Sequence, residues 1–95
     1  MQINYSIDAF ASLTRLVNYI EDKNTEGAGL RWLSRYESFL NEKLLLPQQI
    51  KPCNNVTFRK FGLRCIYFNE WVIAFSIKED FILIEALIHK SRIID

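Results

Sequence analysis

The spacing of apolar residues changes once along this chain of 95 residues, and the change restricts the folds that it can adopt. Before Pro47, apolar residues recur at steps of three and four, which is the period of an amphipathic helix. From Val56 they tend to alternate with other residues, which is the period of a β-strand. Helices followed by strands predict an α+β fold with helices on one face of an antiparallel sheet. The length suits a single domain, residues 1–95.

The first half of the chain is predicted to begin with a short strand and a helix. Ile3 and Tyr5 fit the strand. An N-cap at Ser6 or Asp8 then precedes a helix that should end near Asn24. The predicted apolar stripe of this helix comprises Phe10, Leu13, Val17 and Ile20.

A second helix should follow, with Thr25 as its N-cap and Glu26 in its first turn. Gly27 and Gly29 weaken that turn, but they can also let the two helices approach closely. Pro47 is expected to end the helix, and the short break between the helices implies an antiparallel pair. The predicted apolar stripe comprises Leu30, Leu33, Leu40 and Leu44, widened by Trp32, Tyr36 and Phe39.

The second half of the chain is predicted to form a meander. Gly62 either separates two strands or marks a bulge in one longer strand. The turns at residues 69–70 and 79–80 are short enough to make their flanking strands antiparallel. The predicted order is β-α-α-β-β-β, or one strand more, as an antiparallel β-meander with an α-helical hairpin on one face. The strand segments are 56–61, 63–67, 71–78 and 81–89.

The length of the loop around residues 69–70 decides which face each side chain occupies, because strand side chains alternate. A two-residue turn places Arg64 among the aromatic residues of the helix-covered face, where burial of its charge is costly. A three-residue loop that includes Phe68 places Arg64 on the open face, where it flanks Ala74 together with Glu85. We favour the three-residue loop. Its core face comprises Leu63, Cys65, Tyr67, Trp71, Ile73 and Phe75.

Composition narrows the range of functions without selecting one. The formal net charge is +1. The basic residues in 51–64 are too few to form the strongly basic face of a protein that binds duplex DNA. Cys53 and Cys65 lack metal-ligand spacing and His89 is the only histidine, so we expect two unpaired thiols and no metal site. The N-terminus lacks a secretory pattern, and no apolar stretch reaches bilayer length. We therefore expect a cytoplasmic protein without membrane contact.

Two segments of the predicted sheet resemble motifs of the RelE/ParE toxins of type II toxin-antitoxin systems. Residues 62–67, Gly-Leu-Arg-Cys-Ile-Tyr, are similar to a family strand with an arginine, two hydrophobic residues and a tyrosine. Residues 84–92, Ile-Glu-Ala-Leu-Ile-His-Lys-Ser-Arg, are similar to the closing strand with its histidine and arginine. The order of elements agrees over nearly the whole chain. The resemblance implies a bacterial growth inhibitor of the plasmid-stabilisation type, neutralised by a cognate antitoxin.

The resemblance also implies candidate site residues. RelE-like members cleave mRNA on the ribosome, which requires proton-transfer groups and cations around the scissile phosphate. Arg64 would stabilise that phosphate, while His89 would act as acid or base and Glu85 as base or orienting carboxylate. No cofactor is implied. Binding of RNA backbone or another target is predicted for Arg59, Lys60, Lys90 and Arg92.

Each candidate also has a purely structural interpretation. Arg64 and Glu85 can form a cross-strand ion pair, which contributes little when it is exposed. His89 can be a hydrogen-bonded structural histidine. The basic pair at residues 59–60 can be a solvated strand edge that discourages edge-to-edge pairing, and Lys90 with Arg92 can simply be a polar C-terminus.

Three functions are compatible with these features. A ParE-like toxin would bind DNA gyrase or another large target without chemistry of its own, and we favour it because the dense basic clusters of RelE-like members are thin here. A ribosome-dependent mRNA endonuclease is the alternative, and a non-toxic interaction domain is the third. Leu83 and Leu87, expected to be exposed, together with free strand edges predict that the antitoxin adds a strand or helix. A homodimer could cover the same surface without the antitoxin.

Overall fold

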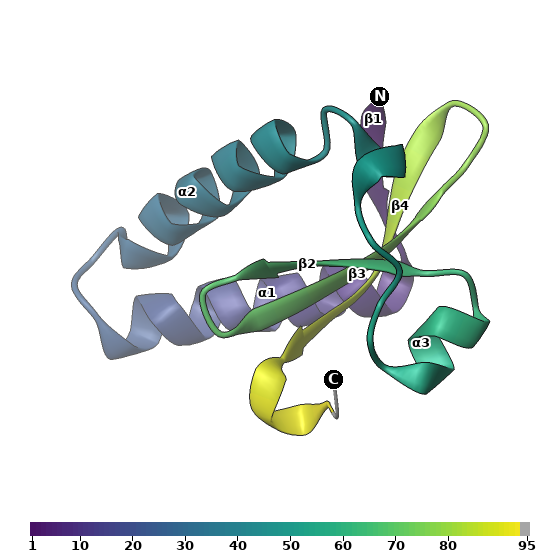
Figure 1. The fold of residues 1–95 in the computed structure, drawn as a ribbon. Helices are drawn as coiled ribbons and strands as arrows, with labels where there is room; N and C mark the ends of the chain where they lie inside the picture. Colours follow the sequence, from purple (N-terminus) through teal and green to yellow (C-terminus); the bar gives the residue numbers. More distant parts are fainter. Residues whose placement is uncertain (94–95) are drawn as a thin grey trace.

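The computed structural model describes residues 1–93, which form a four-stranded sheet with two long helices against one face (Figure 1). No helix within these residues is long and apolar enough to cross a membrane. The helices are α1 (Ile7–Lys23), α2 (Ala28–Lys43) and the short α3 (Val56–Lys60), with single 3-10 turns η1 (Pro47–Gln49) and η2 (Lys90–Arg92). The strands are β1 (Gln2–Tyr5), β2 (Arg64–Phe68), β3 (Trp71–Ile77) and β4 (Phe81–His89).

The sheet has the order β1-β4-β3-β2, so the first strand of the chain lies beside the last. β2, β3 and β4 form the predicted antiparallel meander, whereas β1 pairs with β4 in parallel. The parallel pair follows from the topology, because the helical hairpin and two strands separate β1 from β4 along the chain. The predicted α+β architecture, with a helical hairpin on one face of a meander, is confirmed.

The hairpin starts as predicted but reaches its second helix differently. Ser6 is the N-cap of α1, and its Oγ accepts the backbone N–H of Ala9 at 3.1 Å. The predicted cap at Thr25 is wrong, because α2 begins only after Gly27, which has a φ of 84°. Glu26 therefore precedes the helix and does not occupy its first turn. Glycine suits the position before the helix because it adopts positive φ at little cost.

A carboxylate from α1 caps the start of α2. The Oε2 atom of Glu21 accepts the N–H of Gly27 at 2.8 Å, and its Oε1 accepts the N–H of Gly29 at 2.9 Å. These two bonds hold the pKa of Glu21 below its ordinary value. A Cβ at Gly29 would lie 2.7 Å from the carbonyl oxygen of Val17, so the predicted close approach of the helices is confirmed there.

The main core lies between the hairpin and the sheet, and Leu13, Trp32, Tyr36, Leu40 and Leu44 of the predicted stripes are buried in it. Phe10 and Leu30, predicted to be buried, are 60% and 69% exposed. Ala9, the neighbour of Phe10, is buried instead. The buried set comprises Ala9, Leu13 and Leu16 on α1, Trp32, Tyr36 and Leu40 on α2, Leu44 just after α2, and Ile66, Ile73, Phe75, Ile82, Ile84 and Leu87 on the strands.

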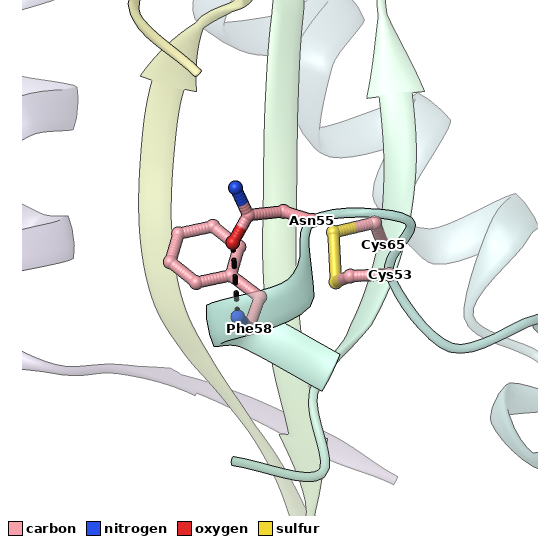
Figure 2. Close-up of a disulfide and its surroundings, with 4 residues drawn as sticks. All are labelled: Cys53, Asn55, Phe58 and Cys65. Atoms are coloured by element: carbon pink, nitrogen blue, oxygen red, sulfur yellow. Dashed lines mark hydrogen bonds between the residues drawn. A yellow bond between two sulfur atoms is a disulfide. The ribbon is translucent and has the colours of Figure 1, made fainter. Parts of the chain in front are cut away.

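Residues 56–61 form α3 and the turn that ends it, and the predicted strand is wrong. The Oδ1 atom of Asn55 accepts the N–H of Phe58 at 3.0 Å and so caps the helix (Figure 2). Gly62 has a φ of 74°, and the N–H of Leu63 reaches the carbonyl of Phe58 at 3.0 Å. This is a Schellman ending, for which glycine is favoured, so Gly62 is not a strand bulge.

The turn between β2 and β3 has two residues, and the favoured three-residue loop is wrong. Phe68 pairs with Trp71, and Arg64 pairs with Phe75. The chain closes this tight turn because Asn69 adopts a φ of 53°, a left-handed conformation that asparagine tolerates well. Arg64 therefore lies on the hairpin side of the sheet, and Tyr67 on the other, 46% exposed.

The face predicted to be open is partly covered by α3 and a disulfide (Figure 2). Cys53 and Cys65 are bonded with an S–S distance of 2.07 Å, contrary to the expected unpaired thiols. They meet because Pro52 bridges to Arg64, which aligns the segment before α3 with the start of β2. The second core comprises Cys53, Leu63, Cys65, Val72 and Ala74, with Phe58, Ala86 and Ile93 packed against it.

Candidate functional site

The three residues predicted to be catalytic are not brought together. Arg64 starts β2 on the hairpin side of the sheet. Glu85 bonds to Ser76, whose neighbours at alternate positions on β3 belong to the second core on the other face. His89 ends β4, four residues and about 13 Å of strand beyond Glu85. No single phosphate could contact all three side chains in this arrangement.

Arg64 has a structural role in the hairpin-side layer. Its guanidinium donates to the carbonyl oxygen of Gln48 at 3.3 Å and also to that of Ile50. These bonds tie the edge strand β2 to the loop after α2. They also satisfy the charge that seemed costly on this face, because the edge position lets the side chain reach backbone oxygens. The predicted cross-strand pair with Glu85 is wrong.

Glu85 lies at an irregularity in the pairing of β3 with β4. Ala74 pairs with Ala86 and Phe75 pairs with Ile84, so Glu85 is the extra residue of a bulge. Its Oε2 accepts the hydroxyl of Ser76 at 2.6 Å, and its carbonyl oxygen accepts the hydroxyl of Ser6 at 3.1 Å. Glu85 therefore joins β4 to β3 and to the start of α1.

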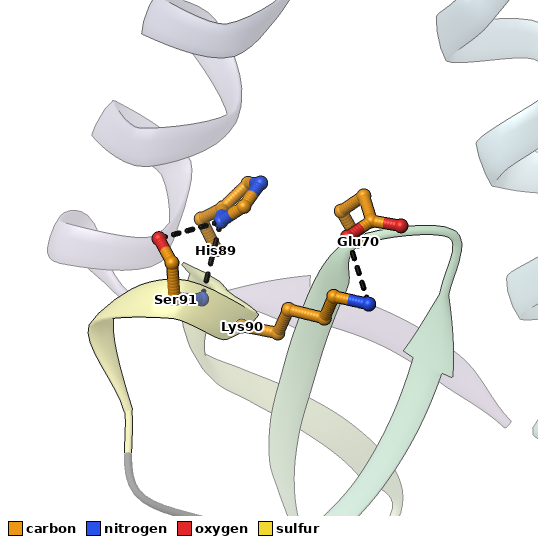
Figure 3. A network of polar contacts seen from close by, with 4 residues as sticks. All are labelled: Glu70, His89, Lys90 and Ser91. Atoms are coloured by element: carbon orange, nitrogen blue, oxygen red, sulfur yellow. Dashed lines mark hydrogen bonds and ion pairs between the residues drawn. The ribbon is translucent and has the colours of Figure 1, made fainter.

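His89 and its neighbours form a small polar network at the end of β4 (Figure 3). The Nδ1 atom of His89 caps η2 by accepting the N–H of Ser91 at 3.2 Å, and it lies 2.9 Å from the Ser91 hydroxyl oxygen. Lys90 forms a 2.9 Å ion pair with Glu70, and its N–H reaches the Glu70 carbonyl at 2.8 Å. The bond from Lys90 holds the pKa of Glu70 below its ordinary value. The β2–β3 turn thus fixes the start of η2.

The remaining predicted residues lie apart from one another. Arg59 and Lys60 are exposed in the last turn of α3. Cationic side chains are stabilising there, because the C-terminal end of a helix carries partial negative charge. Leu83 pairs with Ser76 and is half-buried on the face opposite the hairpin. Leu87, predicted to be an exposed partner contact, is only 3% exposed, because the bulge at Glu85 turns the end of β4 and places Leu87 in the main core.

A cleft of about 620 Å³ opens between α1 and the end of β4. Both charged residues in its lining are arginines, Arg15 from α1 and Arg92 from η2, and the described lining holds no carboxylate. Of the predicted site residues it gathers His89 and Arg92. The rest of the lining comprises Ser12, Leu16, Tyr19, Trp71, Leu87, Ile88 and Ser91.

Sequence reasoning missed the α1 side of this cleft. Ser12, Arg15 and Tyr19 are spaced by three and four residues, so they share one face of the helix. That spacing was available in the sequence, as the polar complement of the apolar stripe. What it could not show is that this face borders the end of β4 and not solvent alone.

Comparisons with known proteins identify a solved structure with the same fold. No protein-family model matches the chain, and no curated protein matches it significantly. A solved structure described as the chromosomal ParDE TA system from P. aeruginosa contains a chain with the same fold, with a TM-score of 0.74 and 14% sequence identity. The match covers 94% of this chain and 95% of that one. The resemblance predicted from the sequence is thus confirmed at the level of structure: the chain has a ParE-like fold.

Proposed function

We propose that this chain is the toxin of a type II toxin-antitoxin system and acts in the cytoplasm by binding DNA gyrase, without chemistry of its own. The observation that carries the toxin assignment is the ParE-like fold over 94% of the chain. Fold alone admits several functions, so the choice of mechanism rests on the residues of this chain.

The placement of the predicted catalytic residues supports binding over RNA cleavage. Arg64 is engaged by two backbone carbonyls on the hairpin side, and Glu85 bonds to Ser76 on the other face. RNA cleavage requires an acid, a base and a cation that converge on one phosphate. A toxin that only binds its target needs no such convergence.

A protein antitoxin is the expected partner, and Leu83 is the predicted contact that the fold keeps available. Leu83 is half-buried on the sheet face opposite the hairpin, the same face as the half-exposed Tyr67. β1 and β2 are the two edge strands, to which an added strand can bind through backbone hydrogen bonds.

The test is induced expression with and without the neighbouring short reading frame that would encode the antitoxin. Expression of the chain alone should arrest growth, and co-expression should restore it. Purified protein should inhibit DNA supercoiling by gyrase and leave transcripts intact in a translating extract. Size-exclusion chromatography of the isolated chain reports whether it forms a homodimer.

Matched variants separate the two mechanisms. His89→Gln and Glu85→Gln keep similar shapes and should remain toxic if the protein acts by binding alone. Leu83→Lys should still arrest growth but resist the antitoxin, because it places a charge in an apolar contact. Transcript cleavage that disappears with His89→Gln would overturn the proposal in favour of a ribosome-dependent endonuclease. Normal growth on expression of folded protein would favour a non-toxic interaction domain.

A further inference from the structure

We propose that the cleft between α1 and the end of β4 binds a nucleotide, with its phosphate on the Arg15, Arg92 and His89 side chains and its base against Tyr19 and Trp71. Nucleotide binding at this site is a separate activity from the proposed binding of DNA gyrase. The site arises from residues that come from opposite ends of the chain and meet only in the folded protein.

The cationic side of the cleft suits a phosphate. Arg15 and Arg92 approach from different walls, and guanidinium groups bind phosphate oxygens through paired charge-assisted hydrogen bonds. The hydroxyls of Ser12 and Ser91 lie in the same lining. A guanidinium N–H of Arg15 already donates to the Ser12 hydroxyl at 3.3 Å, which keeps the two α1 groups together.

His89 presents a donor in a fixed orientation. Its Nδ1 accepts the backbone N–H of Ser91, so the neutral ring carries its proton on Nε2. That second nitrogen points away from Ser91 (Figure 3). The imidazole can therefore donate one hydrogen bond to an anion while its other nitrogen holds η2 in place.

The aromatic side of the cleft suits a base. Tyr19 on α1 is 61% exposed, and Trp71 at the start of β3 packs edge-on against His89 with a centroid distance of 5.2 Å. Nucleobases stack on such aromatic side chains with little regard to sequence. The volume of about 620 Å³ lies within the range of small-molecule sites.

The carboxylate that interacts with His89 is already paired with a lysine. Glu70 interacts electrostatically with His89, but its carboxylate is paired with Lys90 at 2.9 Å. That ion pair (Figure 3), with the backbone bond between the same residues, holds the start of η2 against the β2–β3 turn, and η2 carries Ser91 and Arg92 of the cleft wall. The wall is thus fixed before a ligand arrives, which lowers the entropic cost of binding.

The experiment is an NMR titration of the whole chain with adenosine monophosphate, adenosine and inorganic phosphate. His89 is the only histidine and Trp71 is one of two tryptophans, so the ring signals at the site can be assigned. The nucleotide should shift both residues and bind more tightly than either fragment. No shift of either residue at millimolar nucleotide would overturn the proposal.

Variants test the geometry. Arg15→Gln and Arg92→Gln should each weaken nucleotide binding about tenfold, the effect of one lost charge-assisted hydrogen bond. Tyr19→Leu should weaken binding of the nucleotide but leave that of phosphate unchanged. Arg35→Gln, at an exposed position of α2, is the control and should bind like the native chain. Equal affinity for Arg15→Gln, Arg92→Gln and the native chain would overturn the proposal.

Two further measurements distinguish a free nucleotide from the end of a nucleic-acid strand, and nucleotide binding from toxicity. A short single-stranded oligonucleotide with a terminal phosphate should bind more tightly than the mononucleotide if the ligand is a strand end, and no more tightly if it is a free nucleotide. Growth arrest is scored independently. A toxic chain that ignores nucleotide overturns only this inference, whereas a chain that binds nucleotide but does not arrest growth overturns only the proposed function.

Discussion

Gly29 lies at the closest approach of α1 and α2, and its lack of a side chain sets the spacing of the hairpin. A Cβ there would meet the carbonyl oxygen of Val17 at 2.7 Å, and a backbone atom cannot move aside cheaply. Gly29→Val should therefore lower the free energy of unfolding by about 2 kcal/mol, since overpacking costs roughly that much and valine has only a small propensity advantage over glycine. Urea denaturation measures the loss. Ser34→Val, at an exposed position of the same helix, should have little effect; a similar loss there would point to propensity instead of packing.

Glu21 couples the stability of the hairpin to pH. Hydrogen bonds from Gly27 and Gly29 lower its pKa in the folded chain, so the unfolded chain takes up the proton first as pH falls. Its stabilisation is complete above the ordinary glutamate value of 4.5 and is lost as pH falls through the lower folded pKa. Glu21→Gln should therefore be less stable than the native chain at pH 7 and should lose less stability on acidification.

The measurement for Glu21 is the thermal midpoint between neutral pH and the acid limit of folding. Glu70 also has a lowered pKa, so Glu21→Gln should flatten the acid loss without abolishing it. Glu42→Gln, an exposed change in the last turn of α2, should keep the native pH profile. Parallel profiles for Glu21→Gln and the native chain would show that the cap has no energetic role.

The face of the sheet that Arg64 occupies could not be predicted correctly from the sequence. The alternation around the β2–β3 turn left two registers open, and the cost of burying a guanidinium favoured the wrong one. That cost disappears because β2 is an edge strand, from which the side chain reaches the carbonyls of Gln48 and Ile50. The slip moved only the side chains of β2, whereas Glu85 keeps its predicted face and Leu87 changes face because of the bulge at Glu85.

The disulfide and α3 act together as one element that covers the second sheet face. The bond between Cys53 and Cys65 closes a loop that contains all of α3. Reduction should lower the free energy of unfolding by about 2–3 kcal/mol, mainly because the unfolded chain regains the freedom of that loop. Hydrogen exchange should accelerate first between residues 53 and 63, while α1 stays protected.

The measurement is a thermal melt with and without a dithiol reductant. A Cys53→Ala, Cys65→Ala double variant should melt at a lower temperature and ignore the reductant. Alkylation of the native chain, prepared without reductant, should modify neither cysteine. Two alkylated thiols in that sample would contradict the pairing. The outcome also bears on location, because a cytoplasmic protein meets a reducing pool and would populate the reduced form.

The segment of α3 was predicted as a strand because its sequence carries both strand-favouring residues and helix-capping residues. Val56, Thr57 and Phe58 are β-branched or aromatic residues that favour strands. The cap at Asn55 and the glycine at residue 62 are equally regular signals of a short helix. Packing of Phe58 against the second core favours the helix, and that core includes Val72 and Ala74 of β3, which a local rule does not consider. Long periodic segments such as α1, α2, β3 and β4 carry enough repeats to be predicted without such help.

At the scale of the whole molecule, the order of elements was predictable and their meeting points were not. The change from helical to strand period gives the α+β class and the meander with its hairpin. The cleft at the end of β4 joins α1 to η2, which are about seventy residues apart along the chain. Periodicity is local and cannot report such a contact, so His89 and Arg92 were singled out without their neighbours Arg15 and Tyr19.

The pairing of β1 with β4 closes the chain on itself, and this makes the fold a single cooperative unit. Ile3 of β1 pairs with Ile82 and packs against the main core, so the first strand stabilises the last. Ile3→Ala should destabilise the whole domain by about 2 kcal/mol or more, as expected for truncation of a partly buried isoleucine. It should not merely release the N-terminal strand.

The two tryptophans test this cooperativity from different layers. Trp32 lies on α2 in the main core and Trp71 starts β3, so Trp71→Phe and Trp32→Phe chains each report one layer. Urea transitions followed by fluorescence of either tryptophan and by circular dichroism should coincide, and Ile3→Ala should shift all three by the same amount. A shift in the Trp71 signal alone would mean that the hairpin holds without the sheet. The N-terminal strand would then be a local attachment and not the closure of the fold.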